Sequence, residues 1–386
     1  MLKFESNLEN KNLDPKGKTS LALFPRIERS YSPSPINRSP NIRVSSSQKM
    51  LFPSIKNSRC SSGRNSRLSK GDTMRISTSR CGIIYGYAAD SHSGLAHYRK
   101  SDCMNTITNL PCPKTISESI WPKSSFFAIY DGHGGKACAN FLKEQLHNFI
   151  LQDQDFPYKA KKAIINSFKR ADDKFLTESE ENGEMSGSCA LVVMFIGNKC
   201  IIANTGDSRC VISCMKGTKV KMVTSIHKPS ENEEHARIIN NGGTLSHDYI
   251  LTKTGEAVMH GPARVNPGKL LVSRAFGDLD AKCPRIGGNP KVVIVEPDIK
   301  SFKITQDFDF LLLGTDSFFE FISNREAVDL IWASFNELKG EDFGVQLNGA
   351  MEDLMNDLNR RRQKKNANCM IIAFKNLREN CDEVDN

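Results

Sequence analysis

Residues 126–135 read FFAIYDGHGG, a short apolar run followed by an acid, a histidine and three glycines. The run is brief and aromatic enough to predict a buried strand. The glycines free the backbone, so that the Gly132 carbonyl can approach an ion, and Asp131 adds the hard oxygen that Mg²⁺ or Mn²⁺ prefers. We therefore expect a site that includes Asp131 and His133. The alternative for an isolated D-G-x-G-G is an ordinary turn in which Asp131 caps the next helix.

Further acids follow two other predicted strands. Asp207 comes after the apolar run 200–204, and Asp316 comes after the run 309–314. If these strands lie side by side with 126–130, the three carboxylates converge on one edge of a sheet. Oxygen-ligand metal sites are built from such clusters, so the spacing favours a metal site over a plain turn.

Hydrophobic periodicity and turn residues predict the remaining elements. Further strands are expected at 82–87, 187–196, 200–204, 210–213, 309–314 and 369–374. Helices are expected at 135–151, 157–179, 231–241, 325–338 and 342–361. Ser323 and Glu326 have capping-box spacing before the fourth helix, and Gly242 follows the third. Residues 244–270, which contain Gly and Pro, are expected to form an irregular flap.

Residues 1–80 differ in composition from the rest of the chain. Residues 1–70 contain fourteen Lys and Arg and four acids, and account for about +10 of charge in a chain whose net charge is +9. The segment is rich in Ser, Asn and Pro and lacks periodic hydrophobicity, which predicts a disordered basic tail because too little surface can be buried to offset ordering. It has almost no interleaved aromatics, so we expect no specific nucleic-acid binding.

The twelve cysteines are scattered without a C-x-x-C pair, and several lie in apolar runs. This usage predicts reduced thiols in a cytoplasmic or nuclear protein and argues against structural zinc. No apolar run approaches the length of a membrane span, so no membrane span is expected.

Several further short motifs occur along the chain. They are SGSCA at 186–190, NTGDSR at 204–209, HKPS at 227–230, GGTL at 242–245, LVSRAFGD at 271–278, EPDI at 296–299 and LLLGTD at 311–316. With 126–135 they make the sequence, from about residue 82 to 375, resemble the metal-dependent protein serine/threonine phosphatases (the PPM, or protein phosphatase type 2C, family). The resemblance implies an α+β fold, a four-layer αββα sandwich of two antiparallel sheets flanked by helices. It implies a phosphatase domain at 81–377, between the basic tail at 1–80 and an acidic C-terminal tail at 378–386.

The resemblance also implies a reaction, the hydrolysis of phosphoserine and phosphothreonine in proteins by a hydroxide that bridges two Mg²⁺ or Mn²⁺ ions. Asp131 resembles the carboxylate shared by both ions, and Gly132 resembles the carbonyl ligand. Asp316 resembles a ligand of one core ion, and Asp207 resembles a contributor to a looser third ion. His133 resembles the acid that protonates the leaving oxygen.

Three positions depart from the family pattern in ways that bear on activity. His97 stands where the family has an Arg that binds substrate phosphate, Ser101 where it has a Glu, and Ala367 where it has a metal-binding Asp. We therefore expect a weakened second ion and weaker phosphate binding, and so reduced activity. The alternative is a catalytically inactive pseudophosphatase that regulates a phosphoprotein or a kinase by binding it. Both hypotheses imply a phosphorylated protein as substrate or partner, and we expect a monomer.

Overall fold

The computed structural model describes residues 75–77, 82–92, 101–114, 116–252 and 256–377. The chain divides into two units, Met1–Ser66 and Arg67–Asn386, and every described residue belongs to the second. Most of the predicted basic tail and all of the predicted C-terminal tail lie outside the described residues. Strand β1 (Arg75–Ser77) lies within the segment predicted as a tail and pairs with β2 (Ile84–His92), so ordered structure begins before residue 81.

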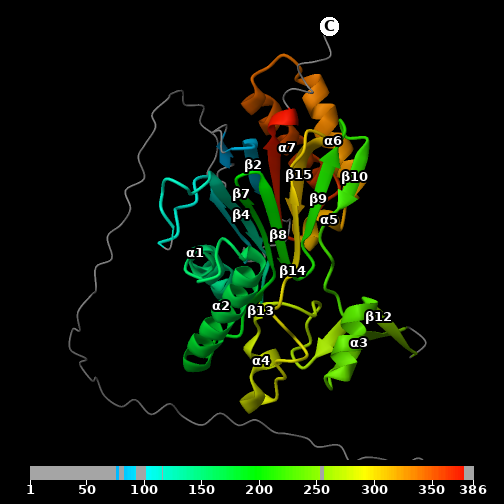
Figure 1. Cartoon of the computed structure of the whole chain (residues 1–386). Coiled ribbons are helices and arrows are strands. Elements are labelled where there is room, and N and C mark those ends of the chain that lie inside the picture. The colour runs from blue at the N-terminus through cyan, green and yellow to red at the C-terminus, as the bar shows by residue number, and fades with distance from the viewer. Residues whose placement is uncertain (1–74, 78–81, 93–100, 115, 253–255, 378–386) are drawn as a thin grey trace, which may run out of the picture. The chain divides into compact units, whose positions relative to one another are not determined.

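Two antiparallel sheets form the centre of the domain (Figure 1). The six-stranded sheet has the order β1, β2, β16 (Ala367–Phe374), β15 (Phe308–Gly314), β9 (Arg209–Cys214) and β10 (Lys219–Met222). The five-stranded sheet has the order β14 (Asp298–Lys303), β8 (Lys199–Thr205), β7 (Ala190–Ile196), β4 (Ser124–Tyr130) and β3 (Cys103–Ile107). Strands are thus confirmed at 126–130 and at five of the six further predicted places, whereas β3, β10 and β14 are not among the predicted strands.

The helices are α1 (Ala137–Leu151), α2 (Ala160–Asn182), α3 (Asn232–Asn240), α4 (Leu279–Lys282), α5 (Asp316–Phe319), α6 (Asn324–Glu337) and α7 (Phe343–Arg360), with a 3-10 turn at Pro284–Ile286. α1 and α2 cover the outer face of the five-stranded sheet and α5 to α7 that of the six-stranded sheet, whereas α3 and α4 lie beyond the sheets (Figure 1). The predicted capping box is confirmed, because Ser323 accepts from the Glu326 backbone N–H and the Glu326 carboxylate accepts from the Ser323 N–H. Gly242 follows α3 with φ of 82°, as the predicted helix end requires. Within the described ranges, no helix is both long and apolar enough to cross a membrane.

Strand β4 shows why the domain has four layers. Its seven residues are all buried, so both of its faces must be covered. Phe126 and Tyr130 pack in the apolar cluster under α1 and α2, whereas Phe127 and Ile129 pack in the cluster between the two sheets. A third cluster joins the six-stranded sheet to α6 and α7 on the other side. The predicted α+β class and αββα sandwich are confirmed.

A small three-stranded sheet extends the fold beyond the end of β4. Its order is β13 (Phe276–Gly277), β6 (Gly187–Ser188) and β5 (Gly132–His133). The prediction of one continuous strand at 187–196 is wrong, because the chain passes at Cys189 from β6 to β7, which belongs to the five-stranded sheet. This break places the Gly-His pair of β5 beside two segments that are distant in the sequence.

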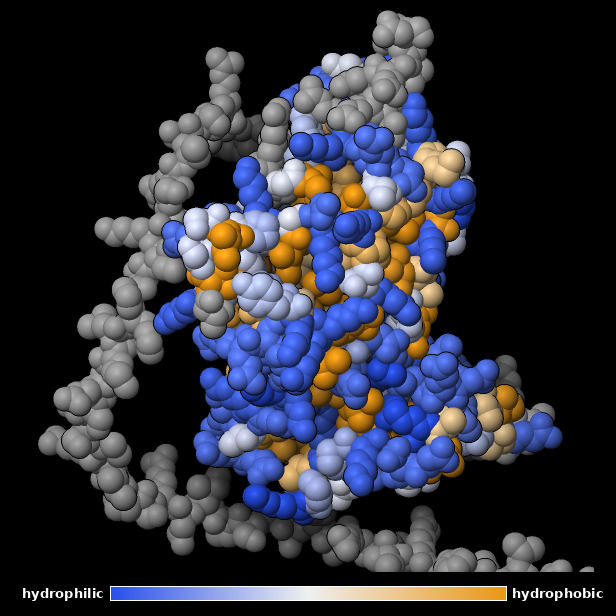
Figure 2. All heavy atoms as spheres, viewed as in Figure 1, coloured by the Kyte–Doolittle hydropathy of each residue, from blue (hydrophilic) through white to orange (hydrophobic). Residues whose placement is uncertain are grey.

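The predicted irregular flap at 244–270 is largely a two-stranded sheet, and that prediction is wrong. β11 (Thr244–Leu251) pairs with β12 (Ala257–Asn266), with a register shift between Ser246 and Asp248. Gly261 and Pro262 lie opposite this shift, where the regular ladder is interrupted, so they do not break the strand. Figure 2 shows apolar side chains gathered over this hairpin. The exposed ones are Tyr249, Ile250, Val258 and Met259.

Candidate active site

Three acids meet between the two sheets rather than along one of them. β4 and β8, which precede Asp131 and Asp207, belong to the five-stranded sheet and are separated by β7. β15, which precedes Asp316, belongs to the other sheet. The three strands therefore do not lie side by side, and the carboxylates converge instead across the end of the sandwich.

The pKa of Asp131 reflects this convergence. Burial is the largest cause that holds the pKa of Asp131 well above its ordinary value, and the charges of Asp102, Asp207 and Asp316 add to it. Burial and the charge of Asp316 also raise the pKa of Asp207, while Lys228 opposes them. Carboxylates held this close and away from water require a cation to remain ionised.

Lys228 supplies such a cation, and the sequence patterns do not identify it. Its Nζ donates to Asp316 Oδ1 at 2.9 Å and lies 3.5 Å from Asp207 Oδ2. The preceding residue, His227, exchanges two hydrogen bonds of 3.1 Å with Gly206, which precedes Asp207. The HKPS segment is thereby held against the loop that carries Asp207.

His133 pairs with an acid 145 residues further along the chain, Asp278. The His133 Nε2–H group donates to the Asp278 carboxylate, with oxygens at 2.7 and 2.9 Å. Asp278 is 2% exposed and His133 31% exposed. A Cβ on Gly187 would lie 2.3 Å from the Asp278 carboxylate, so the pairing needs glycine there. Burial lowers the pKa of His133, but the charge and hydrogen bond of Asp278 outweigh it, and the net direction is upward.

Asp102 adds a further acid to the cluster. Burial raises the pKa of Asp102 to about 6, and Asn368 Nδ2 donates to its Oδ2 at 3.2 Å. The Ser101 hydroxyl lies 2.6 Å from the Gly132 carbonyl oxygen, to which it donates, and 3.3 Å from Asp102 Oδ1. A Cβ on Gly132 would lie 2.4 Å from the Ser101 backbone oxygen, so only glycine fits at this position.

Comparison with known proteins places this site in a family. The sequence profile described as Protein phosphatase 2C matches residues 98–367. The chain belongs to this family. It is 31% identical over 229 residues to Probable protein phosphatase 2C 27 of Oryza sativa subsp. japonica, with 59% of each chain covered. It is 34% identical over 216 residues to Probable protein phosphatase 2C 11 of Arabidopsis thaliana, which covers 56% of this chain and 52% of that protein. The chain thus spans little more than half the length of these relatives.

Solved structures share the fold. A Caenorhabditis elegans sex determining protein ("Structure of a C.elegans sex determining protein") superposes with a TM-score of 0.61 at 20% identity, over 81% of this chain and 68% of that one. The serine-threonine phosphatase 2C from Toxoplasma gondii superposes with a TM-score of 0.56 at 19% identity, over 76% and 96% of the two chains. At these identities the likeness concerns the fold alone.

The donor set fits the divalent ions on which protein phosphatase 2C enzymes generally depend. Asp131, Asp207 and Asp316 provide hard anionic oxygens whose mutual repulsion a divalent ion would relieve, and Gly132 provides a neutral one. Within the described residues, no three His, Cys, Asp or Glu side chains are arranged to hold an ion by themselves.

The positions that depart from the protein phosphatase 2C pattern lie as follows. His97 lies outside the described residues, so its contact with substrate phosphate stays a prediction. Ser101 contacts Gly132 and Asp102 but brings no charge. Ala367 is fully buried in the apolar cluster beside α5 to α7, next to Asn368. Neither Ser101 nor Ala367 gives the site a carboxylate.

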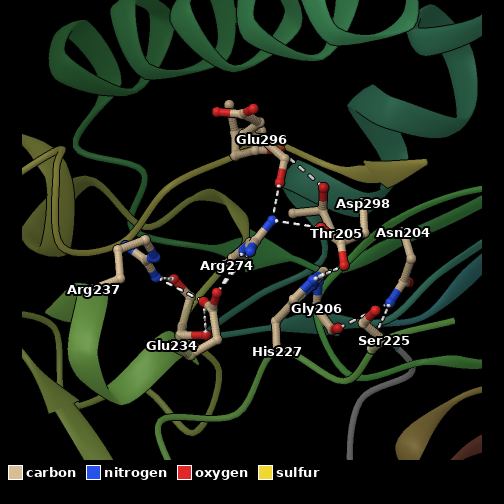
Figure 3. A network of polar contacts seen from close by, with 12 residues as sticks. Asn204, Thr205, Gly206, Ser225, His227, Glu234, Arg237, Arg274, Glu296 and Asp298 are labelled. Carbon is tan, nitrogen blue, oxygen red and sulfur yellow. Dashed lines mark hydrogen bonds and ion pairs between the residues drawn. The ribbon is translucent and has the colours of Figure 1, made fainter. Parts of the chain in front are cut away.

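A polar network, unrecognised from the sequence, includes His227, the residue that precedes Lys228 (Figure 3). Glu234 of α3 accepts from Arg237 at 2.8 Å and from Arg274 at 2.7 Å. Arg274 also donates to Asp298 at 3.1 Å, and Asp298 lies 3.5 Å from His227 Nε2, a long ion pair. The network therefore connects α3, β14 and the segment that precedes Lys228.

Glu234 gives the network a predictable pH dependence. Burial acts to raise the pKa of Glu234, but hydrogen bonds from Arg274, Arg237 and Ser273 outweigh it and lower the pKa to about 2. Because this folded-state pKa lies below the ordinary value of 4.5, the stabilisation is present above about pH 5 and is lost as the pH falls toward 2.

Glu234→Gln should therefore lower the free energy of unfolding at neutral pH by about 2–3 kcal/mol, because two arginines lose a charged acceptor. Urea unfolding at a series of pH values should show this difference from wild type shrinking as the pH falls from about 5 to about 2. Glu233→Gln, at the exposed neighbouring position, is the matched control. A difference that stays constant over this range would contradict the role given to the Glu234 carboxylate.

Proposed function

We propose that this domain hydrolyses phosphoserine and phosphothreonine in proteins, with Mg²⁺ or Mn²⁺ as cofactor and with reduced turnover. The observation that carries the proposal is the convergence of Asp131, Asp207 and Asp316, in the fold that also pairs His133 with Asp278. The clustered carboxylates favour divalent cations, and the histidine offers an acid. Membership of the protein phosphatase 2C family supports the reaction type.

The acids and the glycine carbonyl have distinct parts in this proposal. Asp131 and the Gly132 carbonyl hold the best-bound ion. Asp316 helps to hold a second ion, which is weakened by the lack of a carboxylate at Ala367, and Asp207 contributes to a third, looser ion. When bound, such ions lower the pKa of an attacking water and offset the charge of the phosphate.

His133 is the proposed proton donor to the leaving oxygen. Its Nε2–H group is engaged by Asp278, which fixes the ring and leaves Nδ1 to face a substrate. The Asp278 charge and hydrogen bond raise the pKa of His133 and so favour the protonated ring, whose Nδ1 proton can pass to the serine or threonine oxygen. Asp278 acts only through His133 and is a positioning residue.

A pseudophosphatase is the second candidate function, and one contact favours it. The Ser101 hydroxyl, where the family has a Glu, donates at 2.6 Å to the Gly132 carbonyl, the oxygen expected to bind an ion. If this hydrogen bond keeps the Gly132 carbonyl from binding an ion, the domain binds a phosphorylated protein or a kinase without hydrolysing phosphate. Under either function, the monomeric state and the cytoplasmic or nuclear location stay predictions.

Replacing His133 by asparagine should separate substrates by their leaving group. The serine oxygen of a phosphopeptide needs a proton as it departs, whereas the leaving group of p-nitrophenyl phosphate scarcely does. With Mn²⁺ present, we expect kcat to fall by about a hundredfold or more on the phosphopeptide and by less than about tenfold on the aryl phosphate.

The matched control is His235→Asn, which removes an exposed histidine of α3 and should leave both rates unchanged. Equal losses on the two substrates would contradict the assignment of His133 as the acid. Rates at background for wild type on both substrates, with the phosphopeptide still bound, would favour the pseudophosphatase.

A further inference from the structure

Lys228 touches acids that come from opposite sheets. Asp207 follows β8 of the five-stranded sheet, and Asp316 follows β15 of the six-stranded sheet. The ammonium lies 2.9 Å from Asp316 Oδ1 and 3.5 Å from Asp207 Oδ2. One positive charge thus joins two carboxylates that would otherwise repel each other at the end of the sandwich.

The backbone around Lys228 is held by hydrogen bonds, while its side chain is partly open to solvent. His227 is bound on both sides, to Gly206 through two 3.1 Å hydrogen bonds and to the Ser273 backbone N–H at 2.9 Å. Figure 3 shows His227 against Gly206, the residue that precedes Asp207 in the sequence. Lys228 itself is 33% exposed, so its flexible chain has a route to solvent.

Another lysine of the domain shows what a permanent structural cation looks like. Lys282 is 3% exposed and donates to Asp172 at 2.6 Å and to the Ala275 carbonyl at 2.7 Å. Lys228 is less enclosed, and it contacts Asp207 and Asp316, both acids of the proposed metal site. A competing cation can therefore displace Lys228 from these two acids.

We propose that Lys228 is an internal counter-cation of the site, which lies between Asp207 and Asp316 and must be displaced before these two acids can bind divalent ions. The inference rests on the proposed function in that it takes these acids as metal ligands. It predicts that the chain lowers its own affinity for the ion at this position. Lys228 in turn stabilises the ion-free domain, because its ammonium remains a charged partner for Asp207 and Asp316.

Lys228→Met removes the charge and keeps the length of the side chain. Calorimetric titration of the full chain with Mn²⁺ should show binding that is about ten- to a hundredfold tighter than in wild type, the range over which a charge this close shifts a neighbouring equilibrium. With EDTA, the Tm of the variant should be lower than that of wild type. Saturating Mn²⁺ should raise the Tm of the variant by more than it raises the Tm of wild type.

Lys162→Met is the matched control, because Lys162 pairs with Asp155 on the surface at 2.8 Å and its loss changes the net charge equally. It should bind Mn²⁺ as wild type does. Lys228→Gln, which still can donate to Asp316, is the second variant if the methionine fails to fold, and it should also tighten Mn²⁺ binding.

Mn²⁺ affinity in the Lys228 variants that is equal to or weaker than that of wild type would overturn the inference, as would the absence of binding in every variant. Turnover is not needed for this test. If Mn²⁺ binding tightens while no variant releases phosphate, the inference holds and the proposed hydrolysis fails.

Discussion

Asp131→Asn is expected to abolish metal-dependent phosphate release and, at the same time, to stabilise the metal-free protein. Residues that only support a metal ligand typically contribute about 10–100-fold, so loss of the ligand proposed to be shared by two ions should cost more than about a hundredfold. The opposite effect on stability follows from the pKa of Asp131, which burial and the neighbouring charges of Asp102, Asp207 and Asp316 hold well above its ordinary value. Ionisation of Asp131 at neutral pH therefore destabilises the folded state, and a neutral asparagine avoids this destabilisation.

The two effects are measured on one preparation. Phosphate release from a phosphothreonine peptide is followed with Mn²⁺, and the Tm is measured with EDTA. Asp173→Asn, at an exposed position of α2, should change neither quantity. Retained turnover in Asp131→Asn, or a lower Tm in EDTA, would show that Asp131 is a structural cap rather than part of a metal site.

Asp172→Ala is expected to cause the largest loss of stability of the substitutions considered. Asp172 and Lys282 are 5% and 3% exposed, and the lysine Nζ lies 2.6 Å from the carboxylate. Asp172 also accepts from the Gly277 N–H at 2.8 Å, which fixes the segment that leads into Asp278. Removing the acid leaves a buried ammonium without its charged partner, which typically costs about 3–5 kcal/mol.

Urea unfolding of the single and double variants tests this expectation. Asp172→Leu combined with Lys282→Met removes both charges and should recover much of the lost free energy of unfolding, because no buried charge is left unpaired. Asp173→Ala is the surface control. A single-variant loss below about 1 kcal/mol, the range of exposed pairs, would show that water reaches this pair.

Local patterns in the sequence are enough to predict much of the fold. The apolar run before Asp131 and the Ser323–Glu326 capping box depend on neighbouring residues, so their chemistry is visible without the tertiary structure. The family motifs then imply the αββα sandwich. The hairpin at 244–266 is missed because Gly261 and Pro262 look like strand breakers, whereas they lie at an irregularity that a ladder tolerates.

The contacts of the site are mostly beyond the reach of a single sequence. His133 meets Asp278 across 145 residues, and Lys228 meets Asp316 across 88. Nothing near either residue indicates its partner, because the pairing depends on which strands become neighbours. The Ser101 contact with the Gly132 carbonyl likewise follows from the approach of two backbones, which the missing Cβ of Gly132 permits. The residue types therefore predict the chemistry of the site, whereas the topology of the fold determines which site residues contact one another.

The acid cluster between the sheets is tested most directly by two titrations of the same 386-residue chain with Mn²⁺. One follows ion binding by calorimetry, and the other follows phosphate release from a phosphothreonine peptide. If Asp131, Asp207 and Asp316 form a metal-dependent phosphatase site, phosphate release should rise with ion occupancy, and Asp131→Asn should lose both. Saturable Mn²⁺ binding with no phosphate release at any concentration would contradict catalysis and leave the domain as a phosphoprotein-binding regulator.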